Sequence, residues 1–241
     1  MERFTSLRGH SLRNFFYRSK DLLIDPQKTF TDIEKSNLNE SFIPVILQII
    51  CPIILFYSYY HLVNFPWLLS SMTDGLPVDQ KSSIMKVMTP TIMSASSAIV
   101  IFISVPIVLA ITALYFFLVG KIANIPHSYS RWFVFVSWAS MPVVLVLPIG
   151  LLAILGSDGR LLPAALNPLS LGNILGLEAD SPWASLANAV SLMLLWTLFL
   201  TAVGLHVWTR MTVAKSSFIA ALPYLLIFGT WAAIVLLATA V

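Results

Sequence analysis

The chain has 241 residues, of which 58% are hydrophobic and 10% are charged, with a mean hydropathy of +0.85 and a formal net charge of +3. A soluble domain carries about 25% charged residues, so this composition excludes an ordinary soluble protein and predicts a membrane protein. The single cysteine, Cys51, excludes a disulfide within the chain and any cysteine-rich metal site. We interpret it as a small packing residue.

Residues 1–41 are the most polar part of the chain and hold seven of the fourteen Lys and Arg residues. Arg3, Arg8, Arg13 and Arg18 alternate there with phenylalanine and leucine. This pattern is typical of a basic amphipathic helix that lies on an anionic membrane face. A basic tail without structure and a mitochondrial presequence are the other interpretations of the same pattern.

A short helix is predicted before the first membrane span. Asp25 is placed to be its N-cap and Pro26 its first residue, because proline fits the first helical turn and aspartate accepts a free backbone N–H there. The helix is expected to extend to about Ser36, with Phe30 and Ile33 on its buried edge.

Five charge-free windows follow, and each exceeds the roughly 20 residues that cross the hydrocarbon core of a bilayer. The predicted fold is therefore all-α, a bundle of five transmembrane helices in a domain at 42–241. The spans are expected near 42–63, 93–119, 132–155, 186–208 and 218–239. Several of the tryptophans lie near span boundaries, which is typical of an aromatic belt; the six considered are Trp132, Trp138, Trp183, Trp196, Trp208 and Trp231.

The distribution of Lys and Arg predicts the orientation. Eleven of them fall in the N-terminal region and the loops 120–131 and 210–217, and three fall on the other side. Because cytoplasmic loops carry the excess of Lys and Arg, we expect a cytoplasmic N-terminus and an outer C-terminus. The uncharged segment Leu161–Leu177 is interpreted as part of an outer loop, 157–185, with a short amphipathic helix in the interface. A re-entrant hairpin is the alternative.

Proline and glutamine are the notable residues within the spans. Pro142 and Pro148 lie six residues apart in an uncharged run, which predicts a bent helix packed at the centre of the bundle. Gln48 is expected to hydrogen-bond to another helix, or to a neighbouring carbonyl that Pro52 leaves without a donor.

Spans two and three resemble spans four and five in the placement of glycine and proline. Gly120 precedes Pro142 by 22 residues, and Gly204 precedes Pro223 by 19 residues, with a short basic loop in each interval. A duplication would make the two prolines equivalent and give a repeat of parallel topology. A chance match between apolar segments is the alternative.

The spans contain no Asp, Glu, Lys or Arg, which argues against a proton-coupled pump. We find no nucleophile-and-base motif, no carboxylate pair and no metal-ligand spacing, so the sequence predicts no catalytic residue, no metal and no cofactor. Nucleic acid is not an expected partner.

His206 precedes Arg210 by one helical turn at the predicted cytoplasmic end of span four. One interpretation is a histidine at the depth of the lipid headgroups. The other is a site for an anionic headgroup, formed by these two residues with Lys215 or Lys121.

The order of these features resembles the Yip1 domain family in its bacterial form, over roughly residues 20–240. The resemblance rests on several short elements: Asp25-Pro26 with Thr29-Phe30 and Ile33, Ser137 to Pro142, Trp196 with Leu200, Gly204 and Leu205, then Ser216/Ser217 and Ala220/Ala221. Eukaryotic relatives, which bind prenylated Rab-type GTPases, have Asp-Leu-x-Gly-Pro and Gly-Tyr elements. Here those places hold Leu23-Ile24-Asp25-Pro26 and Ser137-Trp138.

The resemblance implies a non-enzymatic, five-span membrane protein that binds partner proteins or anionic lipid at its cytoplasmic face. A transporter or channel component for lipids or small apolar solutes, as an accessory of an ABC transporter for example, is the alternative. The expected location is the bacterial inner membrane, or an endomembrane or mitochondrial membrane in a eukaryote, and self-association stays open. The candidate contact residues are Asp25, Pro26, Lys121, Arg131, His206, Arg210 and Lys215. The candidate structural residues within the membrane are Gln48, Pro142, Pro148, Gly204 and Pro223.

Overall fold

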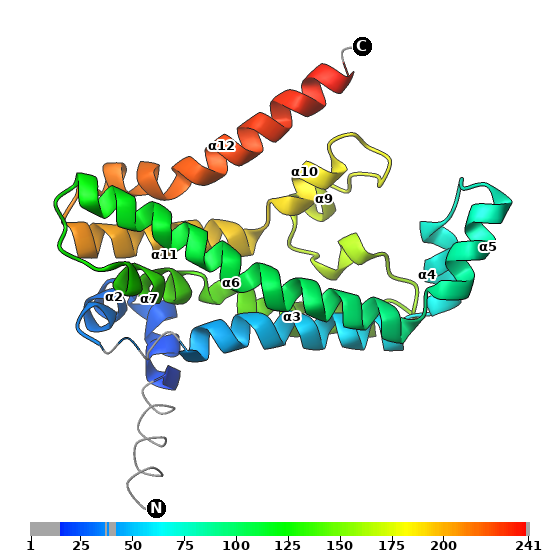
Figure 1. The fold of residues 1–241 in the computed structure, drawn as a ribbon, viewed down its shortest axis with the longest axis horizontal. Helices are drawn as coiled ribbons and strands as arrows, with labels where there is room; N and C mark the ends of the chain where they lie inside the picture. The colour runs from blue at the N-terminus through cyan, green and yellow to red at the C-terminus, as the bar shows by residue number, and fades with distance from the viewer. Residues whose placement is uncertain (1–14, 37, 39–41, 240–241) are drawn as a thin grey trace, which may run out of the picture. The chain divides into compact units, whose positions relative to one another are not determined.

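The computed structural model describes residues 15–36, 38 and 42–239. Among these residues it contains helices and no strand, apart from an isolated bridge between Ser170 and Ser191. Residues 15–24 are helical. The other helices are α2 (Pro26–Glu34), α3 (Phe42–Leu62), α4 (Phe65–Met72), α5 (Val78–Val87), α6 (Pro90–Ile122), α7 (Tyr129–Ala139), α8 (Val146–Leu155), α9 (Leu171–Ile174), α10 (Ala184–Ala189), α11 (Leu192–Thr209) and α12 (Val213–Thr239), with 3-10 segments η2 (Met141–Leu145) and η3 (Pro163–Leu166) (Figure 1). The predicted all-α fold is confirmed.

Five helical stretches of the described residues are long and apolar enough to cross a membrane, which confirms the predicted number of spans. They are Phe42–Leu62, Pro90–Ile122, Tyr129–Leu155, Leu192–Thr209 and Val213–Thr239. The second stretch, α6, has 33 residues. At 1.5 Å per residue it is about 50 Å long, so it extends beyond a hydrocarbon core of about 30 Å.

Contacts between residues divide the chain into two compact units. Unit 1 consists of Met1–Ile46, Val108–Met141 and Trp196–Leu225, and unit 2 consists of Leu47–Ile107, Pro142–Leu195 and Leu226–Val241. Helices α3, α6, α11 and α12 therefore each contribute one part to each unit.

The core of unit 1 includes α2 and α7, which lie side by side (Figure 1). Phe30 and Ile33 of α2 are fully buried, as the sequence predicts, and so are the rings of Trp132 and Trp138 of α7. With Trp208 of α11 only 3% exposed, the aromatic-belt interpretation is wrong for these three tryptophans. They form the interior of unit 1.

Helix α2 begins where the sequence predicts. The Asp25 Oδ1 atom accepts the backbone N–H of Lys28 at 3.0 Å, and Pro26 occupies the first turn. The helix ends at Glu34, two residues before the expected Ser36. The N-terminal boundary follows from local capping chemistry.

Residues 15–24 form the described part of the predicted N-terminal amphipathic segment. Phe15 and Leu22 are buried, and the Phe15 ring lies 5.5 Å from the ring of Trp138. Phe16 and Ile24 are exposed. Residues 1–14, including Arg3, Arg8 and Arg13, lie outside the described residues, so the basic amphipathic character of that part stays a prediction.

Unit 2 contains a second core, formed by side chains of α3, α4 and α8 and of the segment that follows α8. Leu55, Tyr59 and Ile154 are almost fully buried in it. The Tyr59 hydroxyl donates to the backbone carbonyl of Leu161 at 2.7 Å, which joins α3 to that segment. The α4–α5 pair precedes α6, and none of the α5 side chains is buried.

The third span is interrupted rather than simply bent. Helix α7 ends at Ala139, and the chain continues through the 3-10 segment η2 before α8 begins at Val146. Pro142 lies in η2 and is buried, whereas Pro148 lies in the first turn of α8, where a missing N–H costs little. The prolines predict a disturbance of the helix at this place, and it takes the form of a 3-10 segment between two α-helices within the span Tyr129–Leu155.

The fourth span begins at Leu192, and not near 186. The preceding residues form the separate helix α10, and Val190 is extended. The Leu171 N–H donates to Val190 O at 2.7 Å and the Leu192 N–H to Leu169 O at 3.0 Å. These hydrogen bonds hold the end of α10 against the loop at 161–177, which contains η3 and α9.

Pro223 lies inside the continuous helix α12. A proline at this position cannot donate to the carbonyl four residues earlier, which is that of Ile219. The Tyr115 hydroxyl of α6 donates to that carbonyl at 2.8 Å instead. Pro223 and Pro142 thus have different local structures, and the predicted repeat stays a prediction. Gln48 of α3 is buried at 3% exposure.

Candidate functional site

Two sets of hydrogen bonds attach α2 to the rest of unit 1. The middle of α2 is bound by the indole of Trp208, whose Nε1–H donates to the Phe30 backbone carbonyl at 3.0 Å. This bond is buried and joins residues 178 apart in the chain. A buried hydrogen bond of this kind is costly to lose, because the indole N–H would be left buried without an acceptor.

The end of α2 is held by residues at the start of α7. The Arg131 guanidinium donates to the backbone carbonyls of Glu34 and Ser36. The last carbonyls of a helix have no partner within it and carry partial negative charge, so a cation is favourable there. His127 Nε2 lies 3.2 Å from the Glu34 carboxylate, where an N–H donates. Arg131, a predicted lipid or partner contact, is thus engaged inside unit 1.

A cluster of aromatic rings lies under α2. The Phe135 ring lies 5.4 Å from the ring of Phe30 and 5.1 Å from that of Trp208, and Trp132 lies 5.6 Å from Phe135. Gly204 of α11 faces this cluster: a Cβ atom there would lie 2.4 Å from the Phe135 ring and 2.9 Å from the Phe30 ring. The absence of a side chain at Gly204 therefore lets α11 approach α2 and α7.

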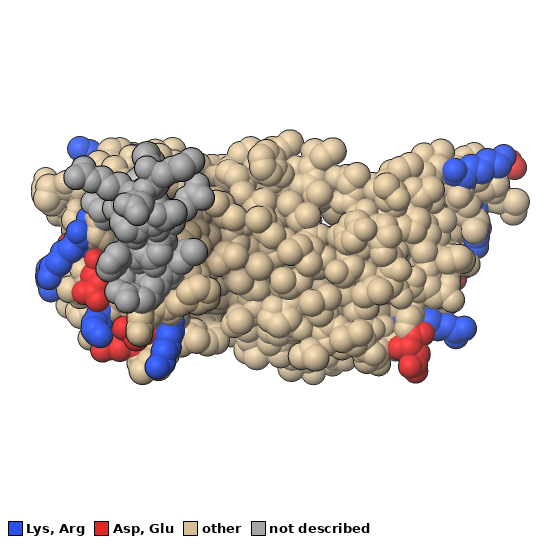
Figure 2. All heavy atoms as spheres, turned by 90° about the horizontal axis from the view of Figure 1, so that it is seen from below, with Lys and Arg blue, Asp and Glu red and all other residues tan. Residues whose placement is uncertain are grey.

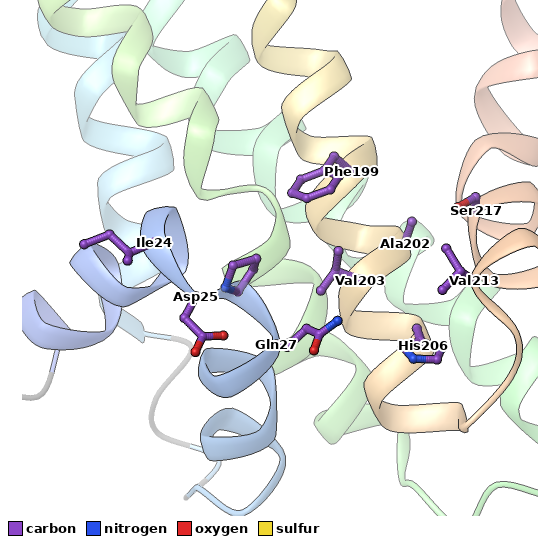
Figure 3. Close-up of a pocket in the computed structure, with 10 residues that line it drawn as sticks. Ile24, Asp25, Gln27, Phe199, Ala202, Val203, His206, Val213 and Ser217 are labelled. Carbon is purple, nitrogen blue, oxygen red and sulfur yellow. The ribbon is translucent and has the colours of Figure 1, made fainter.

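A pocket of about 420 Å³ opens beside the first turn of α2. We call it the His206 groove. Figure 3 shows residues of α2, α11 and α12 around it, together with Ile24 at the end of the helix 15–24, and Gln27 extends from α2 toward α11. The described residues that line it are Ile24, Asp25, Pro26, Gln27, Phe199, Ala202, Val203, His206, Val213 and Ser217. Three of the candidate contact residues, Asp25, Pro26 and His206, thus line one pocket.

The hydrogen bonding of His206 determines what its ring offers to the groove. Its Nδ1 lies 2.6 Å from the Met211 backbone carbonyl, which can only accept, so Nδ1 carries a proton and donates. In the neutral ring, Nε2 is then an acceptor. Asp25 adds a carboxylate, and none of the described lining residues is Lys or Arg.

The remaining candidate contact residues lie outside the groove. Lys121 is exposed, with its Nζ 5.3 Å from the centre of the Phe117 ring. Arg210 and Lys215 are exposed in the α11–α12 connection and the first turn of α12. Arg210 has a φ of 56°, a left-handed conformation typical of a residue that ends a helix. None of these three cations is among the described residues that line the His206 groove, and the joint anion site stays a prediction.

A family model described as the Yip1 domain matches residues 20–234, which is most of the chain. The chain belongs to the Yip1 domain family. A search of curated proteins and a search of solved structures found no match. The match to the Yip1 domain begins ahead of α2 and extends into α12, so both the attached helix and the His206 groove lie within the family domain.

The sequence does not indicate the residues that hold this Yip1 domain's α2 in place, which are Trp208, Glu34 and His127, or the role of Tyr115, which joins α6 to α12. The belt interpretation gives Trp208 another role, and the sequence patterns assign no role to the other three. Their contacts join segments about 90 to 180 residues apart, and no local pattern signals them. The one available signal was the short basic loop, where Arg131 follows His127 by a helical turn.

Among residues 15–36, 38 and 42–239, no group of three His, Cys, Asp or Glu side chains lies close enough to hold a metal ion.

Proposed function

We propose that this Yip1-family chain is a non-enzymatic membrane protein whose cytoplasmic face binds a partner protein or anionic lipid headgroups. The binding surface is the exposed side of α2 together with the α6–α7 and α11–α12 connections. We call this surface the basic platform. Its exposed cations are Lys28, Lys35, Lys121, Arg210 and Lys215.

The observation that carries the proposal is the attachment of α2. Phe30 and Ile33 are fully buried, Trp208 donates to the middle of the helix and Arg131 to its end. A charged helix held in this way presents its exposed side chains in a fixed arrangement. Preorganised groups of this kind bind with less loss of conformational entropy than a flexible tail does.

The distribution of Lys and Arg between the two units supports the basic platform as the binding surface. Unit 1 carries eight Lys and Arg residues in its described part, whereas unit 2 carries only Lys81, Lys86 and Arg160, accompanied by five acidic residues. On the face drawn in Figure 2, the charged side chains gather in groups, and wide stretches between them carry none. Anionic headgroups and acidic protein surfaces are attracted to clusters of Lys and Arg.

The proposal is tested by reversing charge on the platform. The variant Lys121→Glu/Arg210→Glu/Lys215→Glu changes exposed side chains and leaves the contacts that hold α2 intact. Purified from native membranes, it is expected to lose the proteins and anionic lipids that co-purify with the unchanged chain.

The matched control reverses the three cations of unit 2, Lys81→Glu/Lys86→Glu/Arg160→Glu. This control is expected to keep the same associated molecules. If both variants retain them equally, the basic platform is not the binding surface. Removal of residues 1–35 is not a suitable test, because it would delete buried core residues of α2.

The location and sidedness belong to the same proposal: the bacterial inner membrane, with the basic platform in the cytoplasm. A Cys51→Ser chain leaves no thiol, so single cysteines can then be placed at Lys35 or Lys81. In intact cells, an impermeant thiol reagent is expected to label the cysteine at position 81 and not that at position 35.

A second candidate function, a transporter or channel component for lipid or small apolar solutes, is supported by the interruption of the third span at η2. Irregular backbone within a span is characteristic of transporters, where it lines a cavity or a substrate path. Flux in reconstituted vesicles tests it. A flux that disappears when Pro142 is replaced by Ala, in a chain that still folds, would favour transport over binding.

A further inference from the structure

A second pocket of unit 1 opens at the first turn of α7, and we call it the Tyr129 pocket. Its volume is about 310 Å³, and the described residues that line it are Leu38, Tyr129, Ser130 and Phe133. Leu38 is 48% exposed and Tyr129 is 37% exposed, so the pocket offers apolar surface that a binding partner can reach. The volume is at the lower end of the range of about 300–1,000 Å³ that is typical of ligand pockets. It suits one large apolar side chain.

The Tyr129 pocket lies at the level of charged residues and outside the hydrocarbon core. Arg131, in the same helical turn as Tyr129, donates to the backbone carbonyls of Glu34 and Ser36, which places the end of α2 beside this turn. The exposed side of α2 is charged, and charged side chains are costly in hydrocarbon. A protein segment from the aqueous phase can therefore reach the pocket.

Two ammonium groups lie near the pocket. Lys35 lies between the two residues whose carbonyls Arg131 binds, so the backbone at Lys35 is fixed beside the first turn of α7. The Lys121 Nζ atom lies 5.3 Å from the centre of the Phe117 ring, and that ring lies 6.3 Å from the ring of Tyr129. Neither lysine forms a salt bridge with a carboxylate of the described residues, so both charges are available to a partner.

The carboxylates at the end of α2 leave an excess of positive charge near the pocket. Glu34 lies 3.2 Å from His127 Nε2, where an N–H donates to it. Asp32, one turn before Lys35, is exposed. The one exposed carboxylate is outnumbered by the ammonium groups of Lys35 and Lys121. Acidic side chains of a partner are attracted to such a surface.

We propose that the Tyr129 pocket binds one large apolar side chain of a protein segment in which the neighbouring residues are Asp or Glu. The apolar side chain packs against Tyr129 and Phe133, and the acidic residues contact Lys35 and Lys121. Protein–protein interfaces are typically anchored by a few apolar or aromatic side chains in pockets, with charged groups at the rim. The proposal rests on the proposed function, because it names the chemistry of the partner that the basic platform binds.

A protein segment suits this pocket better than an anionic lipid does. A lipid headgroup would meet the same two lysines, but its acyl chains extend into the hydrocarbon core. The pocket lies beside the charged end of α2, where an acyl chain would leave that core. A side chain from a protein in the aqueous phase has no such cost.

The test is selection from a display library of short random peptides against the full chain in nanodiscs of phosphatidylcholine alone. This lipid has no net charge, so any attraction of acidic peptides comes from the protein, and nanodiscs without the chain remove peptides that bind lipid. The selected peptides are expected to share a large apolar residue with Asp or Glu on either side. The anisotropy of a labelled peptide of that consensus then gives its Kd.

Filling the pocket is expected to weaken binding of the consensus peptide. Ser130→Trp adds a large ring at an exposed position that lines the pocket, and the Kd should rise about tenfold or more. Ser128→Trp is the matched control, at an exposed position outside the described lining residues whose side chain makes no cap hydrogen bond. The control should keep the affinity of the unchanged chain. Because both positions are exposed, neither variant should change the melting temperature.

Reversing the charge near the pocket gives a second measurement that does not depend on filling it. Lys35→Glu/Lys121→Glu should also raise the Kd about tenfold or more, because acidic side chains then meet like charge. Lys81→Glu/Lys86→Glu makes the same change in unit 2 and should leave the Kd unchanged.

A set of selected peptides without a shared apolar residue, or without acidic residues beside it, would overturn the proposal. Equal affinity of the Ser130 and Ser128 variants would overturn it as well. Ser130→Trp leaves every cation of the basic platform in place, so these failures are distinguishable from failure of the platform itself. If phosphatidylglycerol associates with the platform and no peptide is selected, the platform stands and the pocket proposal is wrong.

Discussion

The replacement of Gly204 by alanine tests the packing of α11 against α2 most sharply. The new Cβ would lie 2.4 Å from the Phe135 ring and 2.9 Å from the Phe30 ring. Carbon atoms in ordinary contact are about 3.5–4.0 Å apart, so at least one ring must move by about 1 Å. Both rings are fully buried, and Phe135 packs against both Trp132 and Trp208, so neither ring has room to move.

The expected change in the free energy of unfolding is the sum of two opposing effects. Overpacking of a tight interior costs about 1–3 kcal/mol, and we expect the upper end here because two rigid rings are involved. Alanine regains at most about 1 kcal/mol of helix propensity over glycine. The free energy of unfolding of Gly204→Ala should therefore fall by about 2 kcal/mol.

Reversible unfolding in mixed micelles, followed by tryptophan fluorescence, measures this change. Gly229→Ala is the matched control: it lies inside α12, and a Cβ there would meet no atom within 4 Å. The control should be as stable as the unchanged chain or slightly more so. In a Phe135→Leu background the cost of Gly204→Ala should shrink, because the closest ring atom is gone. Equal stability of the Gly204 and Gly229 variants would refute the packing described for α11.

Two hydrogen bonds give further predictions. Tyr115→Phe should lower the free energy of unfolding by about 1–2 kcal/mol, because the Ile219 carbonyl loses its donor, and should have little effect in a Pro223→Ala chain, where a helical N–H can replace that donor. An unchanged cost in the Pro223→Ala background would contradict this account. Trp208→Phe should cost about 1–3 kcal/mol, because it removes the buried indole hydrogen bond to Phe30 and leaves space where the indole packed. It should also speed amide hydrogen exchange in α2 more than in α3; equal exchange in the two helices would show that the indole does not hold α2.

The features that the sequence predicted are those governed by local chemistry. An aspartate followed by proline defines the start of α2, and the apolar spacing of Phe30 and Ile33 identifies its buried edge. Long charge-free windows identify the spans, because crossing a bilayer requires a minimum apolar length.

The boundaries inside apolar runs were harder to predict, since hydropathy does not distinguish one apolar helix from two. The window ahead of span four has no charge, yet Val190 is extended and α10 is separate. Only Ser191, which accepts the Leu194 backbone N–H, signals the true start of α11. Likewise, Pro142 indicates a disturbance but does not determine whether the helix kinks or changes to a 3-10 segment.

The candidate site was predicted in part. Asp25, Pro26 and His206 were selected separately, and the structure places them around one groove. Sequence spacing also suggested that His206 acts with Arg210, because the two are one turn apart. Residue spacing does not reveal the left-handed backbone at Arg210 or the hydrogen bond between His206 Nδ1 and Met211 O, and the joint site stays a prediction.

Site-specific photocrosslinking tests the central claim most directly, namely that the basic platform is a binding surface. A photoreactive residue at Lys35, on the exposed side of α2, is compared in living cells with the same residue at Lys81 of unit 2. The account predicts a defined protein or anionic-lipid adduct from position 35 alone, which disappears when Lys121, Arg210 and Lys215 are changed to Glu. The same adducts from both positions, or an adduct from position 35 that survives the charge reversal, would contradict it.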